Sequence, residues 1–211
     1  PNYNYYPVII SNDVAAIYLS RALAYGRTYY IKIDAGAFKD SGGRAFSGIL
    51  DSKAWRFSTK AKPPLAGAKT ITVAADGSSD FATVQGAVDF IPEGNNAPTT
   101  IFIRNGTYQE IIFFTNKNNL TFLGEDRKKT IIAYANNDRF NNNAGGNPFA
   151  PGAAPPGTVP ARSGSVYRRG LFLAHRVSDL PIPNLTLHNP SAAGGSQAEA
   201  IILNGTQNAH A

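Results

Sequence analysis

The chain has 211 residues, 43% of them apolar and only 16% charged, with a formal net charge of +6. This composition excludes a disordered chain and allows one or two domains with a buried core. No apolar run approaches a membrane span, and the absence of cysteine excludes disulfides and thiolate metal sites. The basic residues are scattered, so we expect a solvated surface and neither a nucleic-acid nor a membrane partner; a weak attraction for an anionic polymer is the alternative.

The first residues, Pro1-Asn2-Tyr3, are not preceded by methionine, and the chain contains none. We therefore expect that it is not a complete translation product and that a leader or a further domain is missing from it.

Residues 1–60 read as a β module. Residues 14–19 and 28–33 are rich in β-branched and aromatic side chains, as in strands. Residues 34–48 are rich in Gly and Asp and predict a loop. Residues 55–59 predict a closing strand with Trp55 and Phe57 on one face.

The later part of this module resembles the end of a bacterial Ig-like domain. The resemblance is carried by Tyr-Gly-Arg-Thr-Tyr-Tyr at 25–30, Phe-Lys-Asp at 38–40 and Trp-Arg-Phe-Ser-Thr at 55–59, whereas Gly42-Gly43-Arg44 departs from the usual Gly-Asn. It implies a small, incomplete β-sandwich-like module, which we interpret as a spacer without a ligand. Residues 61–68, Ala-Lys-Pro-Pro-Leu-Ala-Gly-Ala, predict a linker by composition, so the boundary falls there.

From residue 69 the pattern changes. Residues 70–73 predict a short strand, followed by a turn at 76–79. Asp80 is placed to cap a helix whose apolar residues recur at helical spacing, and Pro92 ends it. The helical set is Phe81, Val84, Val88 and Ile91. Such a short amphipathic helix needs an apolar surface, and the open end of a stack of coils offers one.

Short apolar runs then recur, separated by turns rich in Asn, Gly and Lys. They lie at 100–103, 111–114, 120–123, 130–134, 171–173, 185–187 and 201–203. Asn-Leu-Thr enters a run twice, at residues 119 and 184. Frequent short strands with almost no helix favour a parallel β-helix, and a β-sandwich remains the alternative.

Two segments interrupt this series. Residues 136–169 contain no legible strand, and we interpret them as a long excursion beside a groove or, equally, as a mobile segment. Pro181 and Pro183 each remove a ladder donor, so we expect the following strand to begin at Asn184.

The residues that could carry chemistry form no familiar constellation by themselves. The chain has no Gly-x-Ser-x-Gly elbow, no phosphate loop and no His-rich metal motif. His175, His188 and His210 lie far apart and are interpreted as strand or turn residues. Glu125 and Asp126 are interpreted as a solvated corner.

The order of several motifs over residues 69–211 resembles the opening of a pectin methylesterase. They are Ile-Thr-Val-Ala-Ala-Asp-Gly at 71–77, Phe-Ala-Thr-Val-Gln at 81–85, Gly-Thr-Tyr-Gln-Glu at 106–110, Leu-Thr-Phe-Leu-Gly at 120–124, Asn-Leu-Thr-Leu-His-Asn at 184–189 and Gln-Ala-Glu-Ala at 197–200. The resemblance implies a right-handed parallel β-helix, truncated at residue 211, in a secreted bacterial esterase that acts on methyl-esterified homogalacturonan (pectin). It implies no cofactor and no metal. We expect structural roles in the 106–110 motif: a bend at Gly106, packing by Tyr108 and a turn hydrogen bond from Glu110.

Gln197 is the candidate catalytic residue. In the family, the glutamine at this position donates to the oxyanion of the tetrahedral intermediate, and an amide supplies an N–H without a titrating proton. By alternation Glu199 shares its face, while Ala198 and Ala200 point into a packed interior. Glu199, Tyr167 and Arg168 are the candidate substrate-binding residues; Tyr167, Arg168 and the adjacent Arg169 read equally well as ordinary loop residues.

The family's two catalytic aspartates, in Gln-Asp-Thr and Asp-Phe motifs, and a later arginine belong after the position of Gln197. We therefore expect this chain to be inactive alone and its last β-helical rung to invite edge-to-edge self-association. One rival is a non-catalytic polysaccharide-binding or adhesin-like β-helix. Another is a lyase, which needs a Ca²⁺ carboxylate cluster that is not visible in this sequence.

Overall fold

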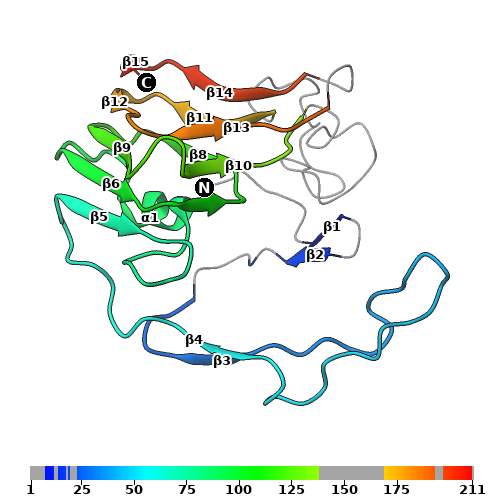
Figure 1. Cartoon of the computed structure of the whole chain (residues 1–211). Helices are drawn as coiled ribbons and strands as arrows, with labels where there is room; N and C mark the ends of the chain where they lie inside the picture. Colours follow the sequence, from blue (N-terminus) through cyan, green and yellow to red (C-terminus); the bar gives the residue numbers. More distant parts are fainter. Residues whose placement is uncertain are drawn as a thin grey trace, which may run out of the picture. The chain divides into compact units, whose positions relative to one another are not determined.

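A computed structural model describes residues 8–11, 14–17, 19, 23–137, 169–192 and 197–210 (Figure 1). By contacts the chain forms two units: Leu19–Pro64, and Leu65–Ala211 together with Pro1–Tyr18. Among the described residues, no helix is long and apolar enough to cross a membrane. Near the start of the chain, β1 (Val8–Ser11) and β2 (Val14–Ile17) form an antiparallel pair.

The Leu19–Pro64 unit is a long antiparallel hairpin. β3 (Thr28–Tyr30) pairs with β4 (Arg56–Ser58), and isolated bridges join Ile33 to Ile49 and Lys39 to Ala45. The strands predicted at 28–33 and 55–59 are therefore confirmed, while the predicted loop at 34–48 is the distal part of the same hairpin. None of its described residues is buried, because a two-stranded ribbon has no second layer to cover it.

The rest of the described chain is a parallel β-helix, as predicted (Figure 1). Each full coil gives one strand to each of three faces: β6–β7–β8, then β9–β10–β11, then β12–β13–β14. The strands are β5 (Thr70–Val73), β6 (Thr99–Ile103), β7 (Gly106–Tyr108), β8 (Ile112–Thr115), β9 (Leu120–Gly124), β10 (Thr130–Ala133), β11 (Gly170–His175), β12 (Ser178–Pro181), β13 (Thr186–His188), β14 (Glu199–Asn204) and β15 (Gln207–His210).

The sheets run in the orders β5-β6-β9, β7-β10-β13 and β8-β11-β14, all parallel, with β12 paired to β15. The amide of Asn119, just before β9, donates to the carbonyl of Ser178 at the start of β12 at 2.9 Å. That bond links the first face to the β12–β15 pair. Each strand therefore pairs with the equivalent strand of the next coil, which is the arrangement that recurring short strands favour.

A short helix, α1 (Val84–Phe90), packs on the first coil. Its buried residues Val84, Ala87 and Val88 belong to the apolar core, so the predicted helix on the end of the stack is confirmed. The predicted cap is wrong, because Thr83 caps the helix by accepting from the amide of Gly86 at 3.1 Å. Asp80 instead accepts from the amide and hydroxyl of Thr72 and so fastens the loop to β5.

The interior of the coils is apolar and contains a cluster of aromatic rings. Phe114, Phe122 and Phe172 come from β8, β9 and β11, are almost fully buried, and contact one another with ring centroids 5.0–5.6 Å apart. Edge-to-face and offset contacts of this kind add to the roughly 1.5–3 kcal/mol gained by burying each apolar side chain. The core therefore fixes the spacing of the sheets.

Residues 106–110 join the first coil to α1. Tyr108 is buried and its hydroxyl donates to the carbonyl of Arg104 at 2.9 Å, which confirms its packing role. Gly106 makes no bend, since it lies within β7. Glu110 makes no turn hydrogen bond; its two carboxylate oxygens accept from the amides of Val84 and Gln85 at 2.8 and 2.9 Å.

The corner from β8, β11 or β14 into the next coil repeats a backbone pattern. Two residues spaced three apart have φ of 51–61°, in the left-handed region that Asn, Asp and Gly adopt most readily. The pairs are Asn116 and Asn119, Arg176 and Asp179, and Gly205 and Asn208. Both Asn-Leu-Thr sequences also begin with a left-handed asparagine, Asn119 and Asn184.

The segment around the two prolines differs from the prediction. β12 includes Pro181, and the strand after it begins at Thr186 rather than at Asn184. The ladder tolerates Pro181 because the next residue, Ile182, donates its amide to the carbonyl of His210 at 2.9 Å. Asn184 turns the chain instead, and its carbonyl lies where a Cβ on Gly124 would be, so the close approach needs glycine there.

Candidate functional site

Gln197 stands at the entrance to β14, two residues before that strand begins. Its side chain is exposed and makes no hydrogen bond with another described residue. The prediction that Ala198 lies in a packed interior is wrong, since Ala198 is exposed, and Ala200 is half-buried. The strand and its alternation begin only at Glu199. Gln197 therefore lies on a segment that leads directly into the sheet, and its side-chain amide has no partner among the residues that the structure describes.

Glu199, the first residue of β14, is held by an ion pair. Nε of Arg169 lies 2.7 and 2.8 Å from its two carboxylate oxygens, and the two side chains are 21% and 33% exposed. Glu199 is the partner of Gly170 in the β11–β14 ladder, so the pair joins the starts of two adjacent strands. Partial burial makes this pair stronger than a surface one, and it fixes the strand two residues after Gln197.

A network of amides anchors the same region from the neighbouring sheet. Asn136 follows β10, is fully buried, and donates through Nδ2 to the carbonyl of Gly170 at 2.9 Å. Asn189 follows β13 and donates through Nδ2 to the carbonyls of Asn136 at 2.7 Å and Glu199 at 3.0 Å. Ser191 adds a hydroxyl bond to Asn189 Oδ1 at 2.8 Å.

This network joins the ends of β10 and β13 to the starts of β11 and β14. Buried amides whose donors and acceptors are satisfied rigidify their surroundings. The start of β14, and with it the segment that carries Gln197, is therefore positioned from three neighbouring strands.

The sequence interpretation named Gln197 and Glu199 as candidate site residues. It did not identify Asn136, Asn189 or the ion pair between Arg169 and Glu199. The available signal was local: Asn136 and Asn189 each follow a predicted strand, where an amide can satisfy free backbone groups. Which carbonyl each amide meets depends on the stacking of coils, and no local pattern specifies it.

Tyr167 and Arg168, predicted to bind substrate, lie outside the described residues, as does the predicted excursion from 138 to 168. The histidines are confirmed as strand residues of β11, β13 and β15. Nδ1 of His175 lies 2.9 Å from the side-chain nitrogen Nδ2 of Asn204, its ladder partner in the next coil.

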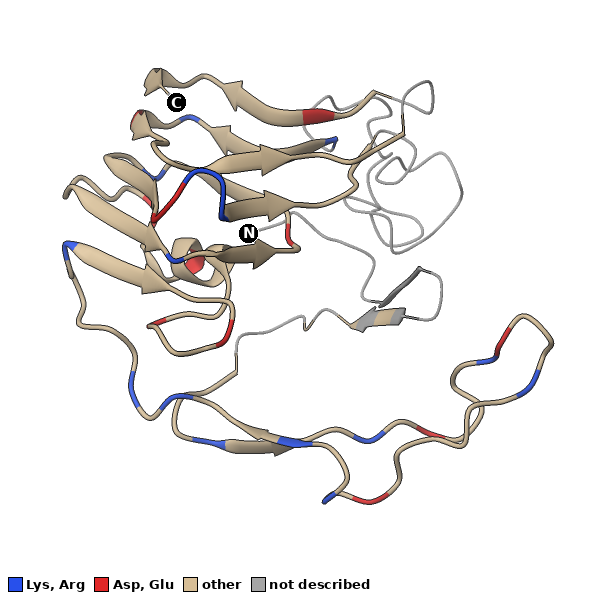
Figure 2. Ribbon diagram, viewed as in Figure 1, with Lys and Arg blue, Asp and Glu red and all other residues tan. Residues whose placement is uncertain are grey.

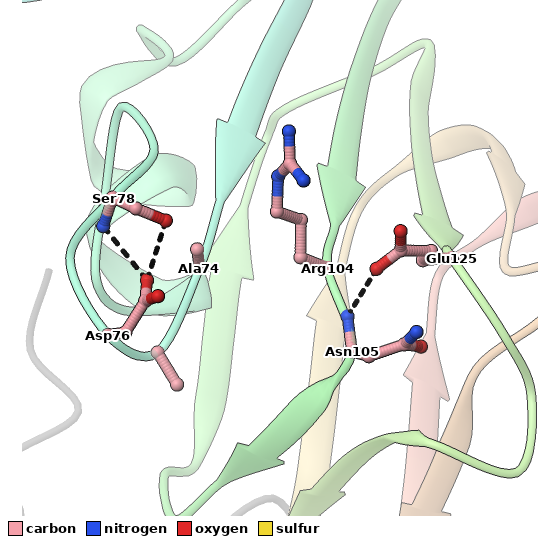
Figure 3. A pocket seen from close by; sticks show the side chains of 7 residues that line it. Ala74, Asp76, Ser78, Arg104, Asn105 and Glu125 are labelled. Atoms are coloured by element: carbon pink, nitrogen blue, oxygen red, sulfur yellow. Dashed lines mark hydrogen bonds between the residues drawn. The ribbon is translucent and has the colours of Figure 1, made fainter.

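A polar concavity lies elsewhere on the coils, where β5, β6 and β9 end (Figure 3). It measures about 340 Å³, and its charged lining residues are Asp76, Arg104 and Glu125. Asp76 accepts from the amide and hydroxyl of Ser78, hydrogen bonds that lower its pKa, and Glu125 accepts from the amide of Asn105 at 2.7 Å. Both carboxylates thus hold turns in place. None of the lining residues belongs to the β8-β11-β14 sheet, into which Gln197 leads.

Chemically, the Gln197 region offers a neutral hydrogen-bond donor next to a fixed ion pair. Such a donor suits negative charge that develops on a carbonyl oxygen during acyl transfer. Among the described residues, no group of three or more His, Cys, Asp or Glu side chains could hold a metal ion.

Comparisons with known proteins agree on one family. A sequence model of the family described as Pectinesterase matches residues 70–147. Pectinesterase 5 of Arabidopsis thaliana is 33% identical over 138 residues, which are 64% of this chain and 20% of that protein. Pectinesterase 4 of the same plant is 46% identical over 63 residues, 29% of this chain and 11% of that protein.

Among solved structures, the pectin methylesterase from carrot superposes with a TM-score of 0.50 at 25% sequence identity. The superposition covers 72% of this chain and 39% of the carrot protein. The chain thus spans well under half of the length of each of these relatives. Residues 70–147 thus match the pectinesterase family model, and the coils of the chain are similar to those of the carrot pectin methylesterase.

Proposed function

We propose that this chain forms part of a pectin methylesterase, which removes methyl esters from homogalacturonan. The carrying observation is the position of Gln197 at the entrance to a strand that Arg169 and Asn189 hold in place, with a side-chain amide that meets no other described residue. In this proposal an aspartate attacks the methyl ester, and Gln197 donates to the oxyanion that forms. Collapse of the tetrahedral intermediate breaks the bond to the methoxy group, which takes up a proton and leaves as methanol, and the acyl-enzyme remains. Water then hydrolyses the acyl-enzyme to the galacturonate carboxylate and the free aspartate.

The reaction needs two carboxylates that the resemblance places after Gln197, so the chain of residues 1–211 should release no methanol from methyl-esterified galacturonan. Methanol release by the purified chain above a buffer control would contradict this expectation. Reading the gene beyond the codon for Ala211 tests the larger proposal. A Gln-Asp-Thr motif followed by Asp-Phe supports the esterase, whereas a stop codon or a continuing frame without these motifs supports the polysaccharide-binding alternative.

In the protein that carries both aspartates, Gln197→Ala should lower kcat by about a hundredfold to a thousandfold with little change in KM, because the lost donor acts mainly on the transition state. Steady-state methanol release measures both constants. Gln207→Ala, which removes an exposed glutamine from β15, is the matched control and should retain wild-type kcat. An unchanged kcat in Gln197→Ala would remove the oxyanion role.

Three finer proposals accompany this function. An extracellular location in a bacterium is supported by a pectin substrate and by the Ig-like sequence pattern. An Ig-like origin of residues 1–60, joined through residues 61–68 to the β-helix from 69, is supported by the antiparallel pairing of β3 with β4. Edge-to-edge self-association is supported by β13, β14 and β15, each of which pairs with one neighbour among the described strands.

Substrate contacts by Tyr167, Arg168 and Glu199 also remain proposals. For Glu199, the ion pair with Arg169 supports an indirect role, in which its carboxylate sets the position of the strand rather than meeting the sugar.

A further inference from the structure

The net charge of the chain is concentrated in the Leu19–Pro64 unit. That unit contains nine basic and three acidic residues, a net charge of +6, whereas the rest of the sequence contains eleven of each. Its basic residues are Arg21, Arg27, Lys32, Lys39, Arg44, Lys53, Arg56, Lys60 and Lys62, and its acidic residues are Asp34, Asp40 and Asp51. Figure 2 shows Lys and Arg spread along this hairpin. The basic residues are scattered along the sequence, but only in this unit do they outnumber the acidic ones.

One face of the β3–β4 ribbon combines this charge with an aromatic ring. Tyr30 and Arg56 are cross-strand partners, so their side chains lie on the same face. The ammonium of Lys32 lies 5.9 Å from the centroid of the Tyr30 ring, and Tyr30 is 59% exposed. We call Tyr30, Lys32 and Arg56 the Tyr30 face.

Hydroxyl groups extend the Tyr30 face along the ribbon. Thr28 and Ser58 are the next pair on this side, and their hydroxyl oxygens lie 2.9 Å apart. The opposite side differs, because Tyr29 and Phe57 stack on each other there at 5.8 Å. Neither Lys32 nor Arg56 has a carboxylate partner among the described residues, so both cations are free to meet an external anion.

We propose that the Tyr30 face binds a polyuronide, the demethylated anionic form of galacturonan. An exposed ring offers a flat surface to the C–H face of a sugar, and the flanking cations pair with its carboxylates. Methyl esterification removes those charges, so the face should prefer demethylated polymer. The choice of a uronide over other polyanions rests on the proposed function, since the esterase reaction produces such carboxylates.

Binding of the full chain to polygalacturonate, measured by affinity electrophoresis and calorimetry at fixed salt, tests the proposal. Highly methyl-esterified galacturonan of matched length should bind at least about tenfold more weakly, because charge-assisted hydrogen bonds are lost. Affinity for polygalacturonate should also fall as salt is raised. Absence of binding, or equal affinity for the two polymers, would overturn the proposal.

Two sets of variants locate the surface. Tyr30→Ala and the double variant Lys32→Gln/Arg56→Gln should each weaken binding by about tenfold, while Tyr30→Phe, which keeps the ring, should bind like the wild type. The double variant Lys60→Gln/Lys62→Gln removes the same charge from exposed positions of the same unit and should change affinity less than twofold. Equal losses in the two double variants would mean that only net charge matters and would refute the Tyr30 face.

Two further outcomes separate this inference from others. Binding of polyuridylate RNA as tight as that of polygalacturonate would identify a nucleic-acid surface and reject the polyuronide. Polygalacturonate binding that depends on the Tyr30 face, in a protein whose aspartate-containing form releases no methanol, would reject the esterase and leave this inference standing.

Discussion

Glu110 lies beneath the first turn of α1, where its carboxylate meets two backbone amides that have no partner within the helix. Burial raises the pKa of Glu110 to about 7, and the two amide hydrogen bonds act in the opposite direction. The side chain of Gln85 continues this attachment, since it exchanges two hydrogen bonds with the backbone of Phe113 in β8. One carboxyl thus joins the end helix to the first full coil.

This raised pKa predicts a pH-dependent stability. A group that binds its proton more tightly when folded stabilises the fold at low pH, and that contribution is lost as pH rises from the ordinary value of 4.5 to about 7. The wild type should therefore lose on the order of 3 kcal/mol relative to Glu110→Gln between pH 4.5 and 7.5. Urea unfolding of both proteins across this range measures the difference.

Glu93→Gln, at an exposed position just after α1, controls for the loss of one carboxyl. If the free energy of unfolding of the wild type, relative to that of Glu110→Gln, stays constant with pH, the two amide hydrogen bonds offset the effect of burial. If it rises with pH, the two amides favour the ionised carboxylate over the protonated one. Either result would contradict the raised pKa.

At the candidate site, sequence and structure contributed different residues. Gln197 was predictable because an ordered set of motifs surrounds it. Asn136 and Asn189 were not, because their partners are the carbonyls of Gly170 and Glu199, which are brought close only when coils stack. The residue that carries the proposed chemistry was therefore visible in the sequence, whereas the residues that position it were not.

At the scale of elements, Arg176 is the exception in the corners. The equivalent residues in the other two coils are Asn116 and Gly205, which adopt the left-handed region at lower cost. Arg176→Asn should therefore raise the free energy of unfolding by up to about 1 kcal/mol. Chemical denaturation measures this gain.

Arg176→Ala is the matched control for that substitution, since it removes the same exposed charge without the local hydrogen bonds that let asparagine adopt this conformation. Arg176→Ala should gain nothing. Equal stability of the two variants would show that backbone strain at this corner is negligible.

Three strands of the β-helix that were not predicted from the sequence share a cause. β7, β12 and β15 are short or polar, so neither an apolar run nor alternation marks them. They are strands because the adjacent coil supplies their hydrogen bonds: Gly106 donates to the carbonyl of Lys129, and Gln207 to that of Val177. The apolar strands follow from their own residues, whereas these three follow from their neighbours.

At the scale of the whole molecule, β13, β14 and β15 predict association, because each has an edge without a partner among the described strands. Leu203 in β14 is 43% exposed, which adds apolar surface to that edge. Size-exclusion chromatography with light scattering should show a mass that rises with protein concentration. Leu203→Lys should shift the protein towards monomer, while Leu65→Lys, at a more exposed apolar position outside the coils, should not. A wild-type monomer at all concentrations would contradict this prediction.

The architecture was predictable because repeated apolar runs without hairpin signals leave few alternatives to stacked coils. The antiparallel continuation of the hairpin through residues 34–48 was not, because Gly and Asp mark a loop whether or not its two sides pair. Propensity describes single segments, and the pairing of segments is settled by the rest of the chain.

The corner pairs have a consequence for how such a protein can change in evolution. β7 and β8 are separated by a few residues, whereas β10 ends at Ala133 and β11 begins at Gly170, yet β8 and β11 stack in register and turn through equivalent corners. Connections on the opposite side of the coil can therefore lengthen at a small entropic cost without shifting the ladder. New surface chemistry can be acquired there, coil by coil, while the scaffold keeps its spacing.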